Sequence, residues 1–120
     1  MIPGAFDYLA PRSVDEVLAA LAQHGDDAKI LAGGQSLIPA MRFRLASPTV
    51  LIDINHLANL EYVQVGNGRL TIGALAREQA LEHSAEIARD FPMLHDAALV
   101  IADPLVRNRA TVGGNLAHAD

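Results

Sequence analysis

The chain has 120 residues, of which 51% are hydrophobic, 19% are charged and only 4% are aromatic. This composition excludes an intrinsically disordered chain, and the length corresponds to one domain or to a part of a larger one. A net charge of −5 disfavours a nonspecific nucleic-acid binder. The absence of cysteine excludes disulfides, thiolate zinc sites, cysteine-ligated iron–sulfur clusters and thiol nucleophiles within this chain.

Signals for membranes or export are missing from the sequence. No apolar run approaches the ~18 residues of a membrane-spanning helix, so we expect no transmembrane segment. The first residues lack the basic region and the apolar stretch of a secretory signal. The expected location is therefore the cytoplasm.

The first predicted elements are a short strand and a capped helix. Residues 6–9 are predicted to be extended. Ser13 and Glu16 form a capping box ahead of apolar residues at helical spacing, and Gly25 lies where a terminating glycine belongs. These signals predict a helix over 14–24.

The alternation of strand and helix continues to residue 54. We expect a short buried strand over 29–32, a helical turn that Ser36 can cap, and a second buried strand over 50–54. Strands that are joined by helices pair most naturally in parallel, so the segment predicts a small α/β unit.

A hairpin and several helices are predicted for the rest of the chain. Residues 63–72 alternate between apolar and polar around Asn67-Gly68, which is the strongest short signal for a hairpin. Residues 75–102 are rich in alanine and leucine and predict two or three helices, one of them capped by Ser84. No predicted element closes the fold after the last glycine pair, so we expect the chain to be the front part of a longer protein.

Two short glycine loops are the best candidates for chemistry. The first glycine loop comprises Ala32, Gly33, Gly34, Gln35 and Ser36. A strand that runs into two glycines ahead of a helical turn lets consecutive backbone N–H groups point at one anion, and the serine hydroxyl adds a donor. The loop matches neither Gly-x-Gly-x-x-Gly nor a P-loop, which disfavours simple NAD-binding and NTPase sites.

A similar pattern recurs near the end of the chain. The second glycine loop comprises Thr111, Val112, Gly113, Gly114 and Asn115. Two such loops predict two backbone nests that serve one ligand with two phosphates. From the residues alone, two independent structural turns remain an equally good interpretation.

The other polar residues predict no catalytic and no metal site. His118 and Asp120 are two ligands only, which is too few for a metal. Asp53 is interpreted as a cap for the turn after its strand, and Arg107 and Arg109 as solvated surface charge. No pair of acids indicates general acid–base chemistry.

Taken together, the motifs resemble a known family. They are, in chain order, Ala32 to Pro39, Leu51 to Ile54, Thr71 to Ala74 and Val106 to Asp120. The chain resembles the FAD-binding medium subunits of molybdenum hydroxylases, the family of aerobic carbon monoxide dehydrogenase medium chains and xanthine dehydrogenase FAD-binding subunits. The resemblance runs along the whole chain, although subunits of this family continue well beyond residue 120.

The resemblance implies an α+β fold, namely the N-terminal part of a vanillyl-alcohol-oxidase or PCMH-type FAD-binding domain with two small α/β subdomains. Residues 1–55 would be the first subdomain, and 56–120 the start of a second, truncated one. The implied cofactor is FAD. Both glycine loops would contact its pyrophosphate, Lys29 would be a further contact, and Asp120 would lie near the flavin or ribityl part.

The resemblance also implies a function as an electron relay. Substrate would be oxidised at a molybdenum cofactor in a large subunit, and electrons would pass through iron–sulfur clusters of a small subunit to FAD and then to an acceptor. The chain would be an oxidoreductase subunit that is not catalytic alone. The alternative is a truncated binding or interaction module that keeps the fold without a flavin.

Overall fold

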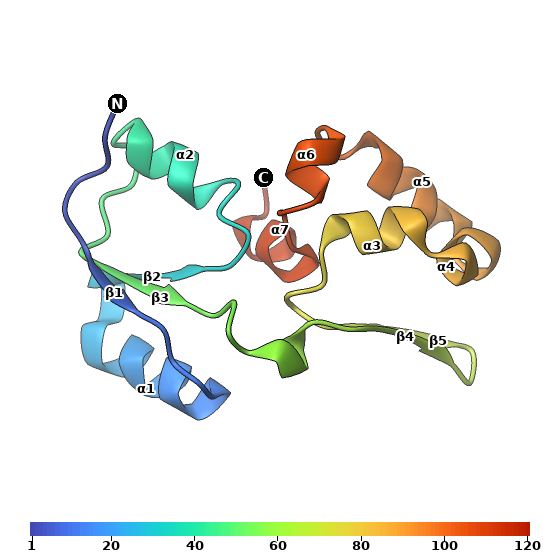
Figure 1. Cartoon of the computed structure of the whole chain (residues 1–120), viewed down its shortest axis with the longest axis horizontal. Coiled ribbons are helices and arrows are strands. Elements are labelled where there is room, and N and C mark those ends of the chain that lie inside the picture. The colour runs from blue at the N-terminus through green and yellow to red at the C-terminus, as the bar shows by residue number, and fades with distance from the viewer. The chain divides into compact units, whose positions relative to one another are not determined.

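The computed structural model describes all of residues 1–120 (Figure 1). The chain divides into two compact units, Met1–Ala58 and Asn59–Asp120, and each is described by itself. Short 3-10 turns occur at Gly25–Asp27 and Ala58–Leu60. None of the helices has the length and apolar character that crossing a bilayer would require.

A three-stranded parallel sheet forms the centre of the first unit. Its strands are β1 (Asp7–Leu9), β2 (Ala28–Leu31) and β3 (Val50–Asp53), in the order β1-β3-β2. Both neighbours pair with β3 in parallel, which confirms the predicted connection. All the strands therefore end at the same edge of the sheet.

Burial differs sharply between the strands. All four residues of β3 are buried, as a central parallel strand requires. The strand expected over 29–32 is present, at Ala28–Leu31, but the expectation that it is buried is wrong, because β2 lies at the edge of the sheet. Lys29 is exposed, and Ile30 keeps 40% of its surface in solvent.

The two helices of this unit are α1 (Val14–His24) and α2 (Leu37–Arg42), and they lie on opposite sides of the sheet (Figure 1). The predicted bounds of α1 are confirmed. The Ser13 hydroxyl accepts a hydrogen bond from the Glu16 N–H at 3.1 Å. Gly25 ends α1 with φ +53 and donates its N–H to the Leu21 carbonyl.

The second unit begins with an antiparallel hairpin of β4 (Val63–Gly66) and β5 (Arg69–Ile72). Its turn residues Asn67 and Gly68 have φ values of +53 and +71. Positive φ at both central positions is the backbone of a type I′ turn, and the strands pair in antiparallel fashion, so the predicted hairpin is confirmed.

Five short helices complete the unit: α3 (Glu78–His83), α4 (Ala85–Asp90), α5 (Pro92–Val100), α6 (Pro104–Arg107) and α7 (Val112–His118). Ser84 caps α4, as predicted. A core of Leu81, Ile87 and Ala98 joins α3, α4 and α5, and side chains of the hairpin pack against it.

Candidate functional site

The first glycine loop lies at the carboxyl end of β2 and leads into α2. Gly34 has φ +76, a conformation that residues with a Cβ rarely adopt. The prediction of a glycine turn between strand and helix is therefore confirmed. In open α/β sheets this edge, beyond the carboxyl ends of the strands, is where ligands bind.

The backbone donors of this loop are free. The N–H groups of residues 33–36 donate no hydrogen bond within the chain. Ser36 occupies the N-cap position of α2, but its hydroxyl makes no capping bond, which corrects the predicted cap. The Gln35 side chain makes only a long 3.5 Å hydrogen bond to the Gly33 carbonyl. A run of unpaired donors with a free hydroxyl is suited to a phosphate.

A network of polar side chains lies behind this loop. Asp53 ends β3 and accepts hydrogen bonds from the Tyr8 hydroxyl, the Asn55 N–H and the Asn55 side-chain amide. The same amide donates to the Ala32 carbonyl at 2.8 Å. The interpretation of Asp53 as a cap for the next turn is confirmed, since its carboxylate receives the Asn55 N–H at 2.9 Å.

The hydrogen bonds of this network also set the protonation states of Asp53 and Tyr8. Burial raises the pKa of Asp53, but the hydrogen bonds from Tyr8 and Asn55 outweigh burial and hold this pKa below its ordinary value. The hydrogen bond to the carboxylate raises the pKa of the Tyr8 hydroxyl. Asp53 is therefore an anion and Tyr8 a neutral donor near neutral pH.

The second glycine loop has a different structure from the first. Thr111 is the N-cap of α7, and Gly113 and Gly114 lie in the first turn of that helix. Neither glycine has a positive φ. The expected glycine turn is therefore wrong, because a threonine cap starts a helix where the glycine pair suggested a loop.

The backbone donors of this second loop are already used. Val112 and Gly113 donate their N–H groups to the carbonyls of Ala76 and Ala74, at 2.9 and 3.0 Å. Gly114 donates to the Thr111 hydroxyl at 3.1 Å. The Asn115 N–H also bonds within the helix, so residues 112–115 do not form an open nest of backbone donors.

Close packing explains the two glycines of α7. A Cβ on Gly113 would lie 2.7 Å from the Ala74 carbonyl oxygen and 2.9 Å from the Ala74 Cα, which are backbone atoms that cannot easily move. A Cβ on Gly114 would lie 2.6 Å from the Thr111 hydroxyl oxygen. The glycine pair thus lets α7 approach the chain after the hairpin and keeps its cap intact.

Glu78 is a buried acid beside α7 that the sequence did not single out. It is 2% exposed, and its Oε2 has no hydrogen-bond partner. Burial raises the pKa of Glu78, while the hydrogen bond with Asn115 and the charge of Arg107 oppose the rise. One charged residue in an alanine-rich helical segment carries no sequence signal for burial.

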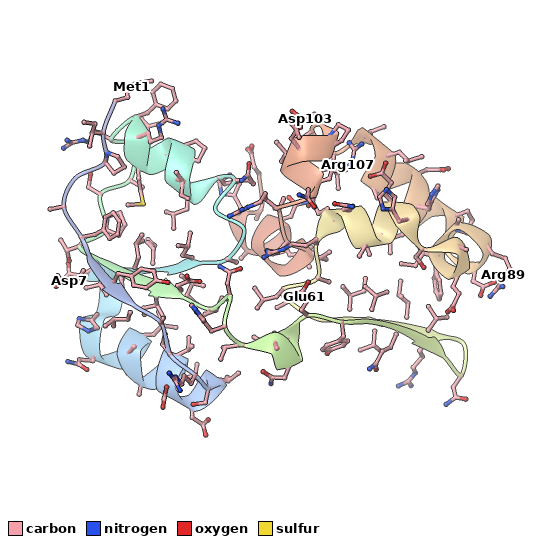
Figure 2. The ribbon with its side chains drawn as sticks, in the orientation of Figure 1. Met1, Asp7, Glu61, Arg89, Asp103 and Arg107 are labelled. Atoms are coloured by element: carbon pink, nitrogen blue, oxygen red, sulfur yellow. The ribbon has the colours of Figure 1, made fainter.

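Arg107 is likewise buried, which corrects its interpretation as solvated surface charge. It pairs with Glu82 at 3.0 Å and donates to the Ile101 carbonyl at 2.8 Å. In Figure 2 the labelled Arg107 lies among the helices of its unit, whereas the labelled Arg89 reaches outward. Arg107 therefore ties α3 to the end of α5 and serves the scaffold.

The remaining predicted residues are exposed. Lys29 lies on the edge strand that leads into the first glycine loop, and Asp120 lies two residues beyond α7. No group of three or more potential metal ligands comes together. The first loop thus carries the open donors, and the second presents the Asn115 side chain, which is engaged with Glu78.

Two hollows have linings that include none of the open donors of residues 33–36. One of about 390 Å³ in the second unit is lined by residues that include Tyr62, Arg77 and His83, and by none of the predicted site residues. A smaller one of about 200 Å³ in the first unit includes Leu31 and Ile38, which flank the first glycine loop. The smaller hollow is lined mainly by apolar side chains, which do not suit a phosphate.

Comparison with known proteins gives a consistent result. Residues 4–120 match the family described as the FAD binding domain in molybdopterin dehydrogenase. The chain is 48% identical to the 6-hydroxypseudooxynicotine dehydrogenase complex subunit alpha of Paenarthrobacter nicotinovorans, over 100% of this chain and 40% of that protein. It is 48% identical to the carbon monoxide dehydrogenase medium chain of Hydrogenophaga pseudoflava, over 98% of this chain and 41% of that protein.

Solved structures agree with these matches. A carbon monoxide dehydrogenase structure from Hydrogenophaga pseudoflava superposes with a TM-score of 0.95 at 48% identity, covering 100% of this chain and 42% of that one. Quinoline 2-oxidoreductase from Pseudomonas putida 86 gives 0.92 at 40% identity, covering 100% and 42%. The chain therefore spans about two fifths of the length of these relatives. The predicted family and the α+β fold class are confirmed.

Proposed function

The chain belongs to the family of FAD-binding domains of molybdopterin dehydrogenases, and on that premise we propose that it binds FAD within a cytoplasmic complex of the molybdenum-hydroxylase type. The observation that carries the proposal is the first glycine loop. Its unpaired N–H groups at residues 33–36 follow a parallel strand, and the backbone there can come close to a phosphate. The relatives named above are subunits of dehydrogenases and oxidoreductases.

The residues of the first loop fit a pyrophosphate well. The N–H groups of Gly33, Gly34 and Gln35 and the Ser36 hydroxyl would hold it, and Lys29 on the adjoining strand adds a positive charge nearby. A bound FAD supplies a carrier that accepts an electron pair and passes it on. The part of this chain is to bind that carrier and orient it.

The second loop contributes in another way under this proposal. Because its backbone donors are paired within the unit, contacts of this segment with FAD would come from side chains such as those of Asn115 and Asp120. Gly113 and Gly114 serve mainly to place that helix. The division into FAD-binding subdomains over 1–55 and 56–120 remains part of the proposal.

The partners under this proposal are a small iron–sulfur subunit and a large molybdenum subunit. The chain has no cysteine to hold a cluster, and none of its buried acids forms an acid–base couple. Electrons would reach FAD from the small subunit and leave to an acceptor. A non-flavin binding module is the less favoured alternative, because such a module has no need of four open donors in one loop.

An absorption spectrum separates these alternatives. The full-length protein, purified with its accompanying subunits, is expected to be yellow and to release FAD on acid precipitation. Anaerobic addition of the substrate should bleach the flavin band only when the molybdenum and iron–sulfur subunits are present. A colourless protein that takes up no added FAD refutes FAD binding, and bleaching in the isolated subunit refutes the relay.

A further inference from the structure

The polar network of Tyr8, Asp53 and Asn55 contacts the first glycine loop but is not among the groups that would hold the pyrophosphate. Its centre is the Asn55 side chain, which donates to Asp53 Oδ1 at 2.7 Å and to the Ala32 carbonyl at 2.8 Å. Both hydrogens of one amide group are therefore used. Asn55 lies on the surface, so a side chain of this kind would ordinarily be mobile.

Asp53 holds this amide in place. It is 9% exposed and receives three donors, two from Asn55 and one from the Tyr8 hydroxyl. Asp53 is the last residue of the buried central strand, so it is anchored by the sheet itself. The orientation of Asn55 is thus fixed by a residue of the fully buried central strand.

Fixing the Ala32 carbonyl also fixes the next N–H group. The carbonyl of Ala32 and the N–H of Gly33 belong to one planar trans peptide, in which they point in opposite directions. With its oxygen held by Asn55, this peptide must direct the Gly33 N–H away from the network. That N–H is the first of the unpaired donors of the loop.

We propose that Asn55, held by Asp53 and Tyr8, is a positioning residue that orients the Gly33 peptide for recognition of the dinucleotide's pyrophosphate. The ligand in this inference, FAD, rests on the proposed function. The orienting contact between Asn55 and the Ala32 carbonyl lies within the chain and needs no ligand. Asn55 does not touch the ligand. It sets the direction of a donor before the ligand arrives, which lowers the ordering cost of binding.

The test compares four variants of the full-length protein. Asn55→Ala removes both donors and is expected to weaken FAD binding about tenfold, the effect of one well-placed hydrogen bond. Asp53→Asn keeps the shape and an acceptor for Asn55, and its affinity should stay within about threefold of the wild type. Tyr8→Phe should show a smaller loss than Asn55→Ala. Gln23→Ala, an exposed amide on α1, is the matched control and should change nothing.

A second readout needs no flavin. Backbone ¹⁵N order parameters of residues 33–36 in the FAD-free protein should be near those of rigid backbone in the wild type, about 0.85, and fall below about 0.6 in Asn55→Ala. A merely stabilising role would lower the melting temperature without this local change. Asp53→Asn, which keeps an acceptor for the Asn55 amide, should retain order parameters near those of the wild type.

The possible results distinguish a failure of the proposed FAD binding from a failure of the positioning role of Asn55. If the wild type binds no FAD, the proposed function fails, while the order parameters still decide the role of Asn55. If the wild type binds FAD and Asn55→Ala folds, binds it equally well and keeps a rigid loop, the positioning role is overturned. Should Asn55→Ala fail to fold, Tyr8→Phe decides in the same way, with a loss of affinity and order supporting the role and wild-type values overturning it.

Discussion

Replacing Gly34 by alanine tests the first glycine loop most directly. Its φ of +76 is unfavourable for alanine by about 1–2 kcal/mol. The new Cβ would also lie 2.7 Å from Ile38 Cδ1, so that side chain must move, at a cost of about 1 kcal/mol. We therefore expect Gly34→Ala to lower the free energy of unfolding by roughly 2–3 kcal/mol.

Gly34→Ala should weaken FAD binding as well as the fold. Relaxing the strained φ at Gly34 rotates the peptides on both sides of it, which turns the open N–H groups away from a common point. We expect the dissociation constant for FAD to rise at least about tenfold. Urea unfolding measures the stability, and flavin fluorescence measures the affinity.

Two matched variants separate ligand contact from fold stability. Gly25 also has a positive φ, +53, but a Cβ there meets nothing within 4 Å. Gly25→Ala should cost about 1–3 kcal/mol of stability without loss of FAD affinity. Adding Ile38→Val to Gly34→Ala removes the clashing Cδ1 but leaves the strained φ, so it should recover only part of the lost stability and none of the lost affinity. Wild-type affinity in Gly34→Ala would refute the reasoning.

Three further predictions concern the second unit. Gly113→Ala pushes a Cβ into the Ala74 backbone and should destabilise the protein by about 2–3 kcal/mol, seen as a lower melting temperature. Arg107→Met leaves the Glu82 carboxylate unpaired and should cost about 3 kcal/mol in urea unfolding. Burial raises the pKa of Glu78 above the ordinary value of 4.5 for a glutamate. The wild type should therefore lose stability as the pH rises from 4.5 through the raised pKa, because the unfolded chain releases this proton first. Glu78→Gln should remove this loss in urea unfolding measured across the same pH range.

Controls for these three come from exposed positions. A Cβ on Gly66 meets nothing within 4 Å, so Gly66→Ala should be nearly neutral. Arg89→Met breaks an exposed pair with Asp90 and should cost less than about 1 kcal/mol. Equal losses in Gly113→Ala and Gly66→Ala, or in Arg107→Met and Arg89→Met, would contradict the packing described. If the stability of Glu78→Gln changes with pH in the same way as that of the wild type, then Glu78 is not the group that causes the pH dependence.

Local chemistry explains which elements the sequence predicted well. The helix over 14–24 has a cap at Ser13 and a terminating glycine at Gly25, and both signals act within a few residues. The hairpin turn depends only on Asn67-Gly68. Features of this kind need no knowledge of distant contacts, so their bounds can be predicted from the sequence.

Burial of the strands and charges could not be predicted in the same way. The apolar residues around Ile30 look like those of a central strand, but the sheet order places β3 in the middle and β2 at the edge. Arg107 is buried because carbonyls at the end of α5 and the Glu82 carboxylate meet around it. The partners of Arg107 lie 6 and 25 residues away along the chain, so its burial depends on how the helices pack.

The two glycine pairs show the same limit within the candidate site. In the sequence both pairs look like phosphate nests, yet Gly34 adopts a positive φ and Gly113 and Gly114 are helical. The difference lies in the partner of each N–H group: those of residues 33–36 donate no hydrogen bond within the chain, whereas those of Val112 and Gly113 donate to the carbonyls of Ala76 and Ala74. The sequence pattern therefore located both segments. Only the structure shows that the backbone N–H groups are unpaired in the first segment and hydrogen-bonded in the second.

This difference has a consequence for how the two segments respond to mutation. The unpaired donors of the first loop are available to a ligand, so a substitution that turns them, such as Gly34→Ala, should lower affinity together with stability. A helix whose donors are bonded to the Ala74 and Ala76 carbonyls contributes to the fold first, so Gly113→Ala should lose stability before any loss of FAD contact can be measured. The ratio of affinity loss to stability loss should thus be high for Gly34→Ala and low for Gly113→Ala. Similar ratios at the two positions would mean that both segments bind the pyrophosphate through their backbones after all.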